Sequence, residues 1–181
     1  MHVKAKTIAT AGLLVAFTIV MIVLSSVIET NTLFLIAAAS FCVGIAIREW
    51  GLLFGLAFLV ASILANLIVA PNKLYCLTYA GMGLYVLLYE WMWKTIADRK
   101  AMSHRNVWLW FGKMLLFNIF YVPTLFLAPK LLFVGKINGL ISIFLLLVEQ
   151  VVFLVYDMAY RYFQARIWGR FRGRLFQLRN F

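Results

Sequence analysis

Apolar residues fill six long stretches of the chain, and short polar or charged segments separate them. The stretches are residues 7–27, 32–47, 50–70, 74–95, 107–127 and 136–160. An α-helix needs about 20 residues to cross the roughly 30 Å hydrocarbon core of a bilayer, and most of the stretches approach that length. The pattern predicts an all-α, polytopic membrane protein with six transmembrane helices.

The positive charges alternate from one gap to the next. One set of gaps, the adjoining ends of the stretches and the two tails hold 14 of the 17 lysines and arginines, whereas the other gaps and their adjoining ends hold only Lys73, Lys130 and Lys136. The larger set is Lys4, Lys6, Arg48, Lys94, Arg99, Lys100, Arg105, Lys113 and the arginines from Arg161 to Arg179. Because lysine and arginine are retained on the cytoplasmic side, the alternation predicts that both termini are inside. We expect a multi-pass protein of a bacterial plasma membrane.

Composition supports a membrane setting. Hydrophobic residues make up 65% of the chain and charged residues 13%, which leaves too little polar surface to cover a soluble particle. The net charge of +11 is therefore mainly a consequence of topology. Cations at membrane boundaries favour anionic lipid headgroups as partners and do not indicate nucleic acid.

The last 21 residues, 161–181, form a basic segment after the predicted six-helix domain of residues 1–160. Apolar residues follow one helical face and arginines another, although Gly169 and Gly173 weaken the helix prediction. The apolar set is Phe163, Ile167, Phe171, Leu175 and Leu178, and the basic set is Arg166, Arg170 and Arg174. Such a pattern is typical of a cytoplasmic helix in the headgroup region or docked on a membrane partner, and solvated arginines below the last span are the alternative.

Catalytic and metal-binding patterns are not evident. Cys42 and Cys76 lie in or at the edge of apolar stretches and are interpreted as small buried side chains, and His2 and His104 are isolated. Membrane-embedded metalloproteases need His-Glu-x-x-His or a similar cluster, and phosphatidyl transferases need several aspartates. We therefore expect no enzyme, metal or cofactor, with acyl or lipid transfer that lacks a recognisable motif as the alternative.

Small residues recur along one stripe of the first predicted helix. Ala5, Ala9, Gly12 and Ala16 are spaced by four, three and four residues, which places them on one helical face. Helices in lipid associate by close van der Waals packing, so a small stripe lets another helix approach. That helix can belong to this chain or to a partner, and a similar row, Ala57, Ala61 and Ala65, follows the third stretch.

Polar residues gather in the half of the bundle that the topology places outside. The candidate ligand-binding residues are Glu29, Asn31, Asn66, Tyr75, Tyr79, Asn118, Asn138 and Glu149. A cluster of this kind can line a pocket for a small polar solute, because polar groups within a membrane need partners. The alternatives are helix caps at Asn31 and Asn72, and an interfacial belt for the tyrosines. Glu149 lies near the middle of the last stretch, where it is expected to face the interior as a structural or a ligand group.

The short basic N-terminus, the segment from Lys6 to Ala16 (KTIATAGLLVA), six spans in 181 residues and the outer polar cluster resemble the substrate-binding S component of an energy-coupling-factor (ECF) transporter. In that family an Ala-x-x-x-Ala motif in the first helix meets the transmembrane coupling component. The corresponding pair here is Gly12 with Ala16, or Ala5 with Ala9. Glycine at the first position departs from the family pattern.

The resemblance implies a subunit that binds a vitamin-like solute from outside, while separate ATPase subunits supply the energy. The chain has no phosphate-binding Gly-x-x-x-x-Gly-Lys-[Ser/Thr] loop of its own, in agreement with that division of labour. The alternative is a non-transporting scaffold or assembly subunit that resembles the cell-shape protein MreD in size and layout. That interpretation requires only the small stripes, the basic tail and membrane partners.

Overall fold

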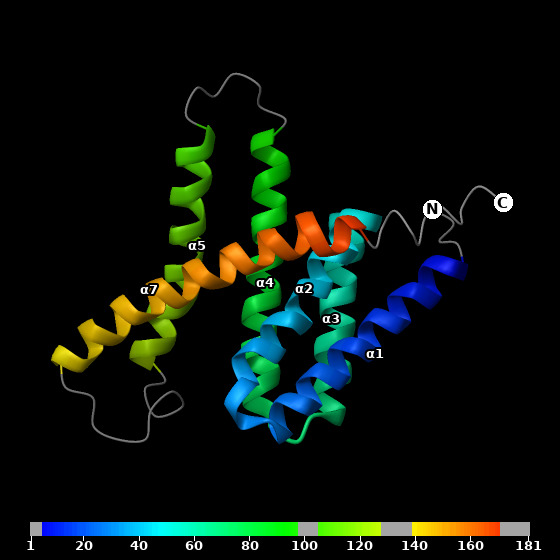
Figure 1. The fold of residues 1–181 in the computed structure, drawn as a ribbon, viewed down its shortest axis with the longest axis horizontal. Coiled ribbons are helices and arrows are strands. Elements are labelled where there is room, and N and C mark those ends of the chain that lie inside the picture. Colours follow the sequence, from blue (N-terminus) through cyan, green and yellow to red (C-terminus); the bar gives the residue numbers. More distant parts are fainter. Residues whose placement is uncertain (1–4, 98–104, 128–138, 171–181) are drawn as a thin grey trace. The chain divides into compact units, whose positions relative to one another are not determined.

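The structure, a computed structural model, describes residues 5–97, 105–127 and 139–170. All regular elements within these ranges are helical, which confirms the all-α part of the prediction for the described residues. The long helices are α1 (Ala5–Val27), α2 (Thr32–Trp50), α3 (Leu52–Val69), α4 (Lys73–Ala97), α5 (Arg105–Leu127) and α7 (Gly139–Tyr162) (Figure 1). The chain divides into two compact units, Met1–Ala101 with α1 to α4 and Met102–Phe181 with α5 and α7.

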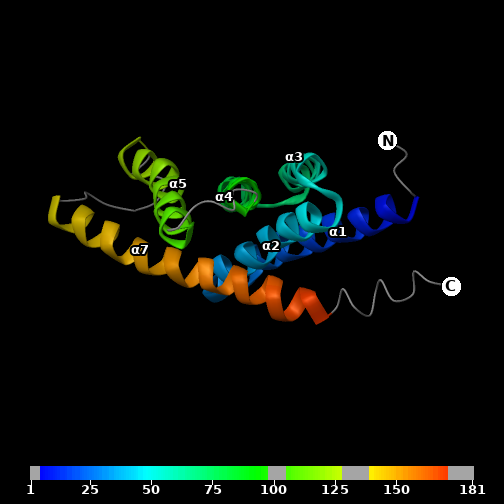
Figure 2. The same ribbon diagram turned by 90° about the horizontal axis from the view of Figure 1, so that it is seen from above.

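In the first unit α2 is the central helix. It packs against α1, α3 and α4, and the two views show it beside these helices (Figure 1, Figure 2). Every residue from Ala39 to Ile47 is buried. Several of these side chains are small, such as Ala39, Ser40 and Ala46, and they allow three neighbours to surround one helix. Cys42 and Cys76 are both buried and free, as predicted.

A tight turn at Gly51 joins α2 to α3. Gly51 has φ of 98°, a conformation that side chains other than hydrogen disfavour. A Cβ atom at Gly55 would collide with the side chain of Ile47, so the two helices meet closely just after the turn. This turn corrects the predicted boundaries, because α2 extends to Trp50 and α3 begins at Leu52.

The two predicted helix caps differ. The Asn72 side-chain oxygen accepts a hydrogen bond of 3.0 Å from the Leu74 amide, which caps the start of α4. The alternative of a cap at Asn31 does not hold, because the Asn31 side chain makes no capping bond. A 3₁₀ turn, Glu29–Asn31, leads into α2 instead, and the Thr32 hydroxyl donates to the Ser25 carbonyl oxygen of α1 at 3.1 Å.

In the second unit α5 and α7 meet through long side chains and run in opposite directions. The rings of Phe117 and Phe153 stack with centroids 4.4 Å apart, and the Gln150 side-chain amide donates to the Asn118 oxygen at 3.0 Å. After Tyr162 the chain continues as a π-helical segment, Phe163–Trp168. Gly169 keeps helical angles, so it does not end the helix. The remainder of the predicted tail, from Phe171, lies outside the described residues.

The distribution of polarity is inverted relative to a soluble protein. Thr18, Ser25, Ser40 and Ser62 are fully buried, whereas large apolar side chains such as Leu53 and Ile68 are more than 80% exposed. The buried hydroxyls donate to carbonyl oxygens of the preceding helical turn. Three helical segments are long and apolar enough to cross a membrane: Thr7–Val27, Thr32–Trp50 and Leu52–Val69. Lipid is the environment that suits such a surface.

Candidate functional site

A buried polar cluster joins α3 to α4 in the first unit. The Ser62 hydroxyl lies 2.7 Å from the Tyr79 hydroxyl, and the Asn66 side-chain NH2 donates to the Ser62 carbonyl oxygen at 2.8 Å. All three residues have no exposed surface. Thr18 of α1, also fully buried, interacts with Tyr79. Three helices thus place polar groups at one point of an apolar bundle, and burial excludes the interfacial-belt interpretation for Tyr79.

The side-chain oxygen of Asn66 is the unsatisfied member of this cluster. It is fully buried and has no hydrogen-bond partner. Leaving a carbonyl oxygen unpaired in an apolar interior costs about 1–3 kcal/mol. Buried oxygens of this kind are few in native proteins, and each requires an explanation such as a ligand, an ion or a water molecule. Asn66 therefore offers an acceptor for a hydrogen-bond donor.

The other predicted ligand residues do not all gather at this cluster. Tyr75 is half-buried one helical turn before Tyr79, so the two tyrosines lie on the same side of α4, whereas Asn31 is exposed. Asn118 belongs to the second unit, where it pairs with Gln150, and Glu149, which precedes Gln150 in the sequence, is half-buried on α7. Glu29 lies in the 3₁₀ turn, where the structure describes its backbone only. Asn138 lies outside the described residues.

Ser62, which the sequence analysis did not select, is the centre of the cluster. It stands four residues before Asn66 in an otherwise apolar helix, so both side chains lie on one face of α3. Two polar residues at this spacing were the available signal. Tyr79 extends the cluster to α4. It is 17 residues from Ser62 along the chain, so no spacing in the sequence indicated that the two side chains meet.

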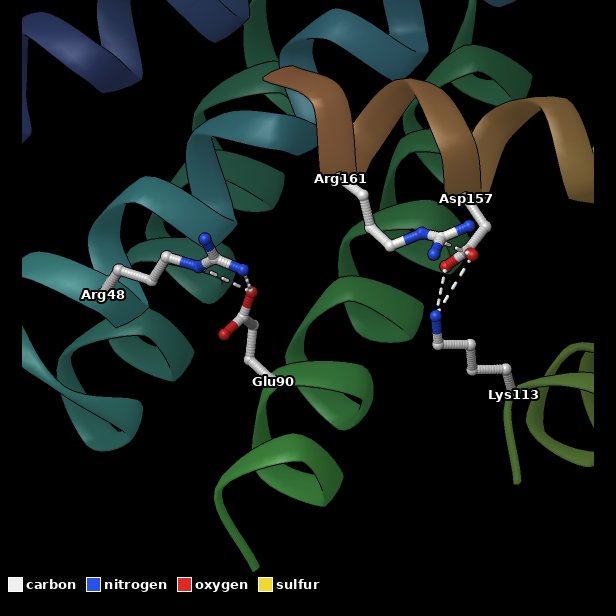
Figure 3. A network of polar contacts seen from close by, with 5 residues as sticks. All are labelled: Arg48, Glu90, Lys113, Asp157 and Arg161. Carbon is white, nitrogen blue, oxygen red and sulfur yellow. Dashed lines mark hydrogen bonds and ion pairs between the residues drawn. The ribbon is translucent and has the colours of Figure 1, made fainter. Parts of the chain in front are cut away.

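An ion pair joins α2 to α4 within the first unit. Two guanidinium nitrogens of Arg48, Nε and Nη2, donate to the Glu90 Oε1 atom at 2.8 and 2.6 Å (Figure 3). The Glu90 side chain is only 7% exposed. Arg48 lies in the last turn of α2, where a cation also interacts favourably with the helix dipole. From the sequence, Arg48 indicated only the topology, and Glu90 gave no signal of its own.

A second charged network lies within the second unit, between α5 and α7. The Lys113 ammonium contacts both carboxylate oxygens of Asp157, at 3.0 and 3.1 Å. Arg161, one turn further along α7, contacts the same carboxylate through Nε at 3.1 Å (Figure 3). Lys113 and Asp157 are both buried, whereas the Arg161 side chain is half exposed. Two cations therefore share one carboxylate, and the network carries a net positive charge.

The small stripe on α1 is exposed. Ala5, Ala9, Gly12 and Ala16 are all uncovered, and a Cβ atom at Gly12 would meet no atom within 4 Å. The packing alternative, in which the stripe meets helices of the same chain, therefore does not hold for α2, α3 and α4. The stripe remains open to lipid or to another protein.

No protein family model, curated protein or solved structure matches this chain. Within residues 5–97, 105–127 and 139–170 no group of three or more histidine, cysteine, aspartate or glutamate residues is arranged to hold a metal ion. The functional inference therefore depends on the buried polar cluster and on the exposed stripe.

Proposed function

We propose that the chain is a membrane-embedded subunit that binds a small polar solute for uptake, in the manner of an S component of an ECF transporter. In this proposal all six predicted stretches span the plasma membrane and both termini are cytoplasmic. The charge alternation supports this orientation. Energy would come from separate ATPase subunits through a transmembrane coupling subunit.

The observation that carries the proposal is the buried Asn66 oxygen beside Ser62 and Tyr79. Polar side chains deep in a transmembrane bundle are costly and commonly serve function. Ser62 and Tyr79 satisfy one another at 2.7 Å, whereas the Asn66 oxygen has no partner. A solute with an N–H or O–H donor would supply the missing bond. In the proposed topology Asn66 and Tyr79 lie in the outer half of the bundle, on the side from which a solute arrives.

Asn66→Ala is expected to abolish solute retention while leaving the protein folded. The variant removes one hydrogen bond and one unpaired oxygen, whose effects on stability oppose one another, so we expect a change within about 1 kcal/mol. The measurement is native mass spectrometry of the full chain, purified in mild detergent from cells grown in rich medium. Wild type should carry a small molecule that Asn66→Ala lacks.

Asn31→Ala is the matched control, because it makes the same chemical change at an exposed asparagine without a capping bond. It should retain the small molecule as wild type does. Retention by Asn66→Ala equal to that of wild type would exclude Asn66 from the site. A wild-type protein that carries no small molecule would count against solute binding and would favour the second function below.

The second candidate function is a non-transporting scaffold or assembly subunit of the MreD kind. The pairing of Asn118 with Gln150 favours it, because Asn118, a predicted ligand residue, joins α5 to α7 through Gln150 instead of facing a solute. The ion pairs Arg48–Glu90 and Lys113–Asp157 also join helices within each unit and so serve the same structural purpose. Both candidate functions require a membrane partner.

Gly12→Leu is expected to reduce recovery of a membrane partner without destabilising the chain. A Cβ atom at Gly12 meets no atom of the protein within 4 Å, so the chain itself tolerates the added side chain. The same side chain would push a partner helix away from the stripe. The measurement is quantitative mass spectrometry of proteins that copurify with the tagged chain. Gly81→Leu, the same change at an exposed glycine of α4 that also has nothing within 4 Å of its Cβ position, is the control. Equal recovery with Gly12→Leu and wild type would indicate that the stripe faces lipid.

A further inference from the structure

Three arginines lie on the exposed side of the C-terminal part of α7 and the π-helical segment. Arg161, Arg166 and Arg170 are all exposed, whereas Phe153, Asp157, Tyr160 and Gln164 mark the buried side. No acidic residue follows Asp157 in the sequence, so no later carboxylate of the chain offsets their charge. We propose that these three arginines form a binding site for the phosphate of an anionic phospholipid.

The charge balance at Asp157 leaves Arg161 available. Lys113 holds both oxygens of the Asp157 carboxylate and matches its single negative charge. Arg161 uses only Nε in this network, at 3.1 Å from Asp157 Oδ2. Its two terminal NH2 groups can donate elsewhere, and the contact with Asp157 restricts the movement of the side chain. A side chain that is already restricted loses less conformational entropy when it binds a phosphate.

The π-helical segment brings Arg161 toward the other two arginines. Arg161 and Arg166 are five residues apart, which in a regular α-helix of 3.6 residues per turn would place them well past one turn. In a π-helix the backbone bonds join residues i and i+5, so each turn holds more residues and the angle between the two side chains decreases. Arg166 and Arg170 are four apart and share a face. The sequence pattern placed Arg166, Arg170 and Arg174 on one helical face and did not include Arg161 in that set.

Apolar side chains beside the arginines indicate a lipid phosphate and not a free anion. Met158, Tyr162 and Ile167 are 59%, 63% and 41% exposed on the same part of the helix. Apolar groups and arginines together are typical of the boundary between acyl chains and headgroups. The arginine fork matches two phosphate oxygens, which a single ammonium does not. The site would select phosphatidylglycerol over phosphatidylcholine, whose phosphate is already balanced by choline.

The test is native mass spectrometry of the full chain in detergent, titrated with phosphatidylglycerol and phosphatidylcholine of identical acyl chains. Wild type should bind phosphatidylglycerol more tightly. Arg161→Gln should lower that affinity about tenfold, the scale of one lost charged hydrogen bond, and leave phosphatidylcholine binding unchanged. Arg161→Lys should recover only part of it, because lysine keeps the charge but loses the fork. Lys94→Gln removes an exposed cation from α4 and should behave as wild type.

Several results would overturn the proposal. The first is equal affinity of wild type for the two lipids. The second is an affinity of Arg161→Gln for phosphatidylglycerol equal to that of wild type. The third is a loss of that affinity in Lys94→Gln as large as in Arg161→Gln, which would indicate a response to net charge alone. Displacement of phosphatidylglycerol by millimolar inorganic phosphate would identify a free-anion site instead. If Arg161→Gln does not fold, the exposed variants Arg166→Gln and Arg170→Gln test the same site. The lipid site is independent of solute binding, so the failure of one proposal leaves the other standing.

Discussion

Asp157→Leu is expected to destabilise the protein by about 3–5 kcal/mol, the cost of removing one partner from a buried ion pair. Lys113 is 8% exposed and contacts both oxygens of the Asp157 carboxylate. Without that carboxylate the ammonium must stay in an apolar interface or pull water into it. The measurement is the free energy of unfolding in mixed micelles titrated with sodium dodecyl sulfate.

The double variant Lys113→Met/Asp157→Leu separates charge from packing. Replacing both members of a buried pair by apolar residues is often neutral or stabilising, so most of the loss should be recovered. Arg161→Gln is the control for the exposed member of the network, and its effect should be below about 1 kcal/mol. A single Asp157→Leu variant as stable as wild type would indicate that water already reaches Lys113.

The positions of the helices could be predicted because a membrane demands a minimum apolar length. The stretch 107–127 became α5, Arg105–Leu127, and the first stretch became α1 with two further residues at its start. The boundary between α2 and α3 was less accurate, because the charged residues Arg48 and Glu49 were interpreted as a gap between two stretches, whereas they belong to the last turn of α2. Gly51 determines that boundary through its backbone conformation, which hydropathy does not detect.

The ion pairs could not be predicted in the same way. Arg48 meets Glu90 over 42 residues and Lys113 meets Asp157 over 44 residues, so each pair depends on which helices become neighbours. The positive-inside rule treats Arg48 and Lys113 as markers of the cytoplasmic side. It gives little weight to aspartate and glutamate, so it does not show which carboxylate each cation meets. Pairing and topology are compatible, because the proposed orientation places all four residues toward the cytoplasmic ends of their helices.

The candidate site was predictable only in part. Asn66 and Tyr79 could be selected because polar side chains within apolar helices are costly in a membrane and commonly serve function. Their connection through Ser62 required the close approach of α3 and α4, which depends on a glycine. A Cβ atom at Gly83 would overlap the Leu59 side chain of α3 and touch Val43 of α2. Gly83 is one turn beyond Tyr79, so it determines how close the Tyr79 hydroxyl comes to Ser62.

Gly83→Leu is therefore expected to destabilise the first unit by at least 1–3 kcal/mol, roughly the cost of overpacking a well-packed core. Leucine favours helix over glycine by about 1 kcal/mol, so an observed loss of stability would understate the steric effect. Gly81→Leu is a closely matched control. It lies two residues away in α4, is exposed, and a Cβ atom there meets nothing within 4 Å, so this variant should be neutral or slightly stabilised.

The same pair of variants tests whether close packing and the polar cluster are coupled. If α4 moves away from α3 in Gly83→Leu, the 2.7 Å contact between Ser62 and Tyr79 must lengthen, and any small molecule that depends on Asn66 should be lost with it. Gly81→Leu should keep both stability and solute. Equal unfolding free energies for the two variants would show that α4 has room to shift, and the cluster would then not depend on Gly83.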